Sequence, residues 1–128
     1  MLAMADGMLE PSRTAMATQQ IHQWINTVWA VVAEGDRYFA GEAPWALAKT
    51  DPTRRDTVLW VLVETIRRVT LLVQPFMPGS TAKILDQLAV PADNRSFAAF
   101  EREVQSGTSL PKPEGVFPRF VEAAKAAS

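Results

Sequence analysis

The sequence has 128 residues, of which 48% are hydrophobic and 21% are charged, and these values are ordinary for one globular domain. It contains no cysteine and one histidine, which excludes a disulfide framework and a cysteine-based metal site. The net charge of −1 excludes the evenly basic surface of a general nucleic-acid binder, so any contact with RNA must depend on a local site.

Short helical patterns precede the first long helix. Residues 2–8 are rich in alanine, leucine and methionine, so we expect a helix there, and no capping residue precedes it. Pro11 either takes the first position of a new helix or kinks one already under way. The sequence leaves both arrangements open.

A clear amphipathic helix begins at Ile21. Apolar side chains recur with helical spacing at Ile21, Ile25 and Val28, and polar residues lie between them. Trp24 and Trp29 widen this apolar stripe. Both tryptophans can bury a large area, so we interpret them as core side chains rather than as platforms for a ligand.

Residues 36–49 form a junction after this helix. Gly41 is a natural helix stop, because glycine adopts the left-handed conformation at low cost. Pro44 prevents a simple continuation and fixes its own φ, and Trp45 follows it directly. A rigidly placed aromatic ring suits stacking on a flat ligand such as an unpaired base. On chemistry alone, a buried plug that closes the junction is the more common role for a tryptophan.

The next helix has a strong start signal, because Asp51 can cap it and Pro52 suits its first position. Its apolar residues cover most faces, which predicts a central helix of a bundle. Glu64 and Arg68 lie four residues apart and are expected to pair on the remaining polar strip. Pro75 ends the pattern. The apolar residues at helical spacing are Leu59, Leu62, Ile66, Val69 and Val73.

A shorter helix fits residues 78–88. Its inward side chains are Ile84, Leu85 and Leu88. Phe97 and Phe100 are expected to anchor a short helix to the bundle. Residues 107–118 are rich in proline and glycine and should run extended over the surface, where their apolar side chains pin them. These pins are Leu110, Val116 and Phe117. Residues 123–128 are expected to fray.

These elements predict an all-α fold and one domain over residues 1–128. About four helices form a bundle over residues 2–106, and an extended tail, residues 107–128, packs on its surface. The longest apolar run, Val58 to Val63, is far shorter than the roughly 20 residues of a membrane-spanning helix. No basic segment followed by an apolar run marks a secretion signal. We therefore expect a cytoplasmic protein without a membrane partner.

Catalytic constellations are poor in this sequence. A lone histidine, His22, leaves too few ligands for a metal centre, and we expect it on the surface or at a helix cap. We interpret the carboxylates near the junction as a solvated rim rather than as an acid–base pair. The sequence has no glycine-rich phosphate loop and no Gly-x-Ser-x-Gly elbow. No catalytic or metal-binding residue is predicted. The carboxylates are Glu34, Asp36 and Glu42, and the arginines expected to be solvated are Arg54, Arg55, Arg67 and Arg68.

A family resemblance starts at the junction. The run from Arg37-Tyr38 through Ala43-Pro44-Trp45 to Lys49 resembles the Asn-Arg-Tyr … Ala-Pro-Trp … Ala-Lys signature of methionyl-tRNA synthetases, in their C-terminal helical anticodon-binding domain. Asp36 departs from this pattern, because the family usually has asparagine there. The resemblance covers nearly the whole chain. Further matches follow in the right order, at Val58 to Leu62, Gln74 to Pro78, Lys83 to Leu88, Leu110 to Pro113 and Val116 to Arg119.

The resemblance implies a domain that recognises the CAU anticodon of methionine tRNA. The family tryptophan that stacks on the first anticodon base matches Trp45, and the proline beside it matches Pro44. Arg37 and Lys49 are further candidates for contact with RNA. The family's other anticodon determinants, an asparagine and an arginine, belong to an earlier helix that would precede Met1.

The resemblance also implies a methionine–tRNA ligase that uses ATP. The His-Ile-Gly-His and Lys-Met-Ser-Lys-Ser type motifs that handle ATP in that family are absent from these 128 residues. We therefore expect the chain to be inactive alone, to hold no cofactor and to work with a catalytic domain of the same longer chain.

Two alternatives remain open at this point. One is a free-standing helical module that binds RNA or protein. The other is the equivalent domain of another class I synthetase, such as those for cysteine or the branched aliphatic amino acids. A fold alone does not separate these functions, but the Ala-Pro-Trp junction favours methionine.

Overall fold

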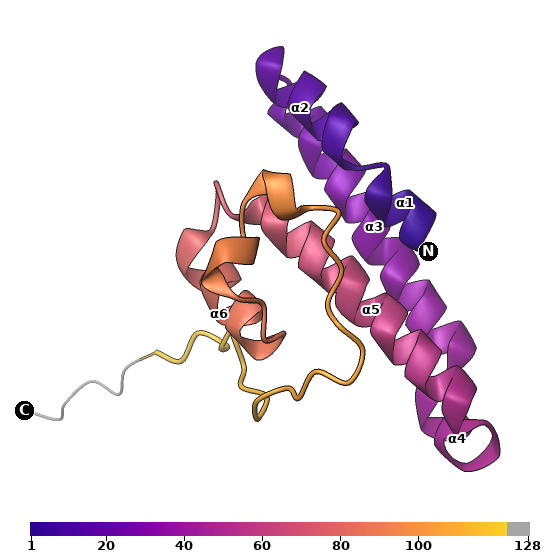
Figure 1. The fold of residues 1–128 in the computed structure, drawn as a ribbon. Helices are drawn as coiled ribbons and strands as arrows, with labels where there is room; N and C mark the ends of the chain where they lie inside the picture. The colour runs from indigo at the N-terminus through magenta and orange to yellow at the C-terminus, as the bar shows by residue number, and fades with distance from the viewer. Residues whose placement is uncertain (123–128) are drawn as a thin grey trace, which may run out of the picture.

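The computed structural model describes residues 1–122, and within that range it contains only helices and loops (Figure 1). The prediction of an all-α fold is confirmed. The α-helices are α1 (Leu2–Asp6), α2 (Leu9–Ala17), α3 (Ile21–Glu42), α4 (Pro44–Thr50), α5 (Pro52–Val73) and α6 (Pro78–Gln87), and the 3-10 helices are η1 (Ala92–Asn94) and η2 (Phe97–Ala99). The predicted fraying of residues 123–128 lies outside the described residues.

The two longest helices, α3 and α5, pack against each other and form the centre of the bundle. α1 contacts α5, and α2 contacts α3. α4 lies at the turn between the two long helices, and α6 packs on α5 at its other end (Figure 1). The buried apolar core joins α1, α2, α3, α5 and α6, and it includes Met8, Val28, Val31, Leu71, Leu85 and Phe100.

The helix starts follow local chemistry. The Asp51 carboxylate accepts a hydrogen bond from the Arg54 backbone N–H at 3.0 Å, and Pro52 takes the first position of α5, so the predicted cap is confirmed. Pro11 is the third residue of α2 and neither opens nor kinks it. A proline is tolerated there because the first N–H groups of a helix have no partner within the helix.

The polar strip predicted on α5 is wrong, because Glu64, Arg67 and Arg68 are buried. Glu64 Oε2 pairs with Arg67 Nη2 at 2.9 Å and with Arg68 Nη1 at 2.5 Å. Asp6 of α1 forms a further ion pair with Arg68, at 2.7 Å from Nε. The predicted Glu64–Arg68 pair therefore forms in the interior, where each charge needs its partners.

This buried ionic cluster, Glu64, Arg67 and Arg68, also holds the segment after η2. Arg67 Nη2 donates to the Phe100 carbonyl at 2.8 Å, and Glu64 Oε1 accepts from the Val104 N–H at 2.7 Å. The segment covers this face of α5, which explains why the charges are buried. Sequence spacing alone shows no sign of a cover that lies about 40 residues away.

Several side chains predicted to lie in the core are exposed. Trp24 is only 7% exposed and stacks on Phe76, with ring centroids 4.3 Å apart, whereas Trp29 is 65% exposed. Leu59 and Ile66 of α5 are also exposed. The core prediction is therefore right for Trp24 and wrong for Trp29, because the Trp29 side chain lines a groove that is open to solvent.

The tail is held mainly by hydrogen bonds. The Gln87 amide donates to the Glu114 carbonyl and accepts from the Glu114 N–H, both at 2.9 Å. Of the three predicted apolar pins, Val116 is half-buried, whereas Leu110 and Phe117 remain exposed. Of the two phenylalanines expected to anchor the preceding segment, Phe100 is buried and Phe97 is exposed.

Candidate nucleic-acid interface

The candidate site lies where α3 ends and α4 begins, at one end of the bundle (Figure 1). The predicted stop at Gly41 is wrong, since Gly41 stays inside α3 and the left-handed residue is Ala43, with φ of 44° and ψ of 63°. Proline disfavours the right-handed helical conformation in the residue before it, so Pro44 moves the break to Ala43. The Ala43 carbonyl then accepts a hydrogen bond from the Ala46 N–H at 2.8 Å and starts α4.

Trp45 is the second residue of α4 and is 60% exposed. Its ring packs edge-on against Phe39 of α3, with centroids 5.3 Å apart and planes inclined by 68°. This contact supports the indole from one side and leaves much of it open. Pro44 is buried and anchors the start of α4. Trp45 is therefore not a core plug but an open aromatic surface on a rigid turn.

A bidentate ion pair joins the two helices beside this turn. Arg54 of α5 donates from Nη2 to Glu42 Oε1 at 2.7 Å and from Nε to Glu42 Oε2 at 3.1 Å. The Glu42 carboxylate raises the pKa of Arg54 above its ordinary value. Arginine is charged at physiological pH in any case, so the pair is a charge-assisted contact between the two helices.

Tyr38 lies one helical turn before Glu42 on α3. Burial raises the pKa of the Tyr38 phenol above its ordinary value of 10.0, and the Glu42 charge raises it further, while Arg54 lowers it. The phenol is therefore protonated at neutral pH and can donate a hydrogen bond.

The structure separates the other candidate residues. Lys49 is exposed and lies one turn after Trp45 on α4, so the two side chains share a helix face. Arg37 is exposed and pairs with Glu34. It lies two residues before Phe39, and such residues face different sides of a helix, so Arg37 is not brought to the Trp45 ring. Asp36 is exposed on α3.

Sequence reasoning missed Phe39 and Arg54 as parts of this site. Phe39 lies within the junction run, but its contact with Trp45 depends on the turn at Ala43. Arg54 was expected to be solvated, and its partner lies 12 residues away on another helix. The predicted acidic rim is partly neutralised, because Glu42 is ion-paired.

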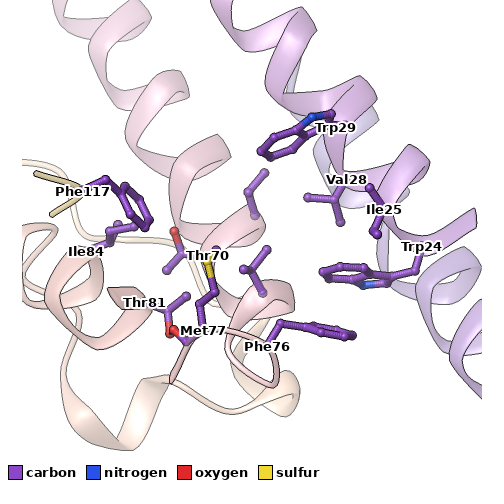
Figure 2. Close-up of a pocket in the computed structure, with 12 residues that line it drawn as sticks. Trp24, Ile25, Val28, Trp29, Thr70, Phe76, Met77, Thr81, Ile84 and Phe117 are labelled. Carbon is purple, nitrogen blue, oxygen red and sulfur yellow. The ribbon is translucent and has the colours of Figure 1, made fainter. Parts of the chain in front are cut away.

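A second surface feature is an apolar groove between α3, α5 and α6. It has a volume of about 400 Å³. Figure 2 shows Trp24 and Trp29 of α3 on one side, and Met77, Ile84 and Phe117 across from them. None of the lining residues within the described range 1–122 is charged, so the groove suits an apolar partner.

No group of three or more His, Cys, Asp or Glu side chains in residues 1–122 is arranged to hold a metal ion. Among the helices described there, none is long and apolar enough to cross a membrane. The junction itself offers an exposed aromatic ring at Trp45 and a charged contact between Arg54 and Glu42.

Residues 2–127 match a family described as the anticodon binding domain of methionyl tRNA ligase. Similar curated proteins include methionine–tRNA ligases of Mesorhizobium japonicum, 59% identical over 116 residues, and Brucella suis, 54% identical over 123 residues. These matches cover 89% and 95% of this chain but only 22% and 24% of the relatives. The chain thus spans less than a quarter of the length of these relatives.

Solved structures agree with these similarities. The apo form of Mycobacterium tuberculosis methionyl-tRNA synthetase superimposes with a TM-score of 0.90 at 40% identity, over 95% of this chain and 25% of that one. The same enzyme bound by methionyl-adenylate gives a TM-score of 0.88 at 40% identity, over 91% of this chain and 24% of that one.

Proposed function

The chain belongs to the family of anticodon-binding domains of methionyl-tRNA ligases, and from that premise we propose that it binds methionine tRNA by recognising the CAU anticodon. The observation that carries this proposal is Trp45, an exposed indole held on a rigid turn by Pro44 and Phe39. Such a ring offers one face to an unpaired base, which is how single-stranded RNA is commonly bound.

In the proposed complex, the first anticodon base stacks on Trp45. Lys49, one turn away on the same face of α4, supplies a positive charge for a neighbouring phosphate. Arg37 faces another side of α3 and would reach only a more distant part of the RNA backbone. Pro44 contributes by fixing the turn rather than by touching the base, since it is buried.

We propose that residues 1–128 act as one domain of a longer methionine–tRNA ligase. The relatives carry that name, and one solved relative binds methionyl-adenylate. ATP use and attachment of methionine would then belong to a catalytic domain elsewhere in the longer chain. A cytoplasmic location follows from a role in translation.

The test of anticodon recognition is a comparison of two tRNAs. The full-length ligase is titrated with methionine tRNA carrying CAU and with a transcript that differs only in the first anticodon base. We expect the altered transcript to bind about tenfold more weakly, within the range for one stacked base. Equal affinity for the two tRNAs would contradict anticodon recognition at this site.

The apolar groove supports a second part of the proposal, contact with the rest of the ligase. Trp29, Met77 and Phe117 expose apolar surface around it. More than three quarters of the length of the closely similar relatives lies outside the matched region. We propose that a segment of that remaining chain packs into the groove, as an apolar helix face packs into a groove between helices.

Hydroxyl-radical footprinting can test this contact. We expect Trp29 to be oxidised several times faster in the 128-residue chain than in the full-length ligase, because the groove is covered only in the latter. Trp45 is the matched control, since the proposal leaves its ring open in both proteins before RNA binds. Equal oxidation of Trp29 in the two proteins would show that the groove stays uncovered.

A further inference from the structure

The bond between Glu42 and Arg54 closes the chain around α4. Glu42 is the last residue of α3, and Arg54 lies in the first turn of α5. Both carboxylate oxygens are used, at 2.7 and 3.1 Å, so the guanidinium meets the carboxylate in a two-pronged contact with a defined direction. The chain between the two residues contains the Ala43 turn and all of α4, including Trp45.

The backbone of Arg54 is held as firmly as its side chain. Its N–H donates to the Asp51 carboxylate at 3.0 Å, in the cap that starts α5. Tyr38 lies one turn before Glu42 on α3 and so shares its helix face. Arg54 is thus tied to the end of α3 and to the start of α5.

Helix stability does not explain the choice of these two charges. The C-terminus of a helix favours positive charge and its N-terminus favours negative charge. Glu42 ends α3 and Arg54 is the third residue of α5, so each charge occupies the helix end that disfavours it. Departures from a local rule of this kind are common at functional sites.

The ion pair also contributes little to global stability. The Arg54 side chain is 47% exposed and the Glu42 side chain is 28% exposed. Ion pairs that are open to water are usually weak. Ala43, however, holds a left-handed conformation that is unfavourable for a residue with a side chain. Pro44 fixes the break at Ala43, and the Glu42–Arg54 bond adds a second, directional contact across the same turn.

We infer that Arg54 is a positioning residue for Trp45: its two-pronged bond to Glu42 sets how α4 leaves α3 and so directs the indole toward RNA. This inference rests on the proposed stacking of an anticodon base on Trp45. It assigns to Arg54 no direct contact with RNA.

The experiment compares Arg54→Gln with Arg55→Gln in the full-length ligase. Arg55 is the matched control, because it pairs with Asp56 on its own helix, at 2.7 Å, and does not bridge helices. We expect Arg54→Gln to weaken binding of CAU tRNA about fivefold, at the low end of the range for one stacked base. The preference of Arg54→Gln for CAU tRNA over the transcript with an altered first base should fall by a similar factor. The melting temperature of Arg54→Gln should stay near that of Arg55→Gln.

A charge swap separates positioning from direct phosphate contact. Glu42→Arg combined with Arg54→Glu rebuilds the pair with each charge at the favoured helix end. Positioning predicts that the swap restores the preference for CAU tRNA, whereas Arg54→Lys, which keeps the charge but not the two-pronged geometry, restores it only in part. A swap that binds no better than Arg54→Gln would overturn the inference.

Trp45→Ala, measured in parallel, distinguishes a failure of the positioning role of Arg54 from a failure of the proposed anticodon recognition. If Trp45→Ala loses anticodon preference and Arg54→Gln keeps it, the positioning role fails and the proposed function stands. If neither change alters the preference, both fail.

Discussion

Replacement of Glu64 by glutamine is expected to destabilise the fold by about 3–5 kcal/mol, the usual cost of removing one partner from a buried ion pair. Glu64 is fully buried and is the shared partner of Arg67 and Arg68, which are 1% and 2% exposed. Glutamine keeps the shape of the side chain but removes its charge. Arg67 is then left in the interior without a counter-charge, and Arg68 retains only Asp6.

The measurement is urea unfolding of the 128-residue chain, followed by far-ultraviolet circular dichroism. Glu34→Gln is the matched control, because it breaks an exposed pair with Arg37 on α3 and should cost about 1 kcal/mol or less. We also expect the segment after η2 to exchange its amide hydrogens faster in Glu64→Gln, since the Val104 N–H loses a charged acceptor. Similar unfolding midpoints for the two variants would contradict a structural role for the buried ionic cluster.

Replacement of Trp45 by alanine is expected to weaken binding of methionine tRNA by roughly 1–3 kcal/mol, the range for loss of one base–aromatic stack. This corresponds to a loss of about fivefold to more than a hundredfold in affinity. The stability of the fold should change little, because Trp45 is 60% exposed and loses mainly its edge contact with Phe39. A core tryptophan would instead cost about 3–5 kcal/mol of stability.

Comparing two proteins with two tRNAs isolates the contribution of the contact between Trp45 and the first anticodon base. Wild type and Trp45→Ala are each titrated in the full-length ligase with CAU tRNA and with the transcript altered at the first anticodon base. The effect of Trp45→Ala should largely vanish for the altered transcript, because that contact is already poor. An equal loss for both transcripts, or a large fall in melting temperature, would remove Trp45 from anticodon recognition.

The sequence by itself determined the elements whose signals lie within a few residues of each other. Asp51 and Pro52 start α5 because a cap and a fixed φ act on the adjacent turn. The spacing of Ile21 and Val28 predicts α3 because a helix places such residues on one face. The run around Trp45 also carries the resemblance to the family, because a sequence motif is identified from the order of its residues alone.

The tertiary structure alone decided which side chains are covered. Trp24 and Trp29 have the same chemistry on the same helix, but Trp24 stacks on Phe76, which follows the end of α5, and is buried, whereas Trp29 is exposed. Glu64 and Arg68 pair as their spacing predicts, but they are buried because a segment about 40 residues away lies over them. Periodicity shows which face of a helix is apolar or charged, whereas burial depends on what packs against that face, and that partner is brought there by the rest of the chain.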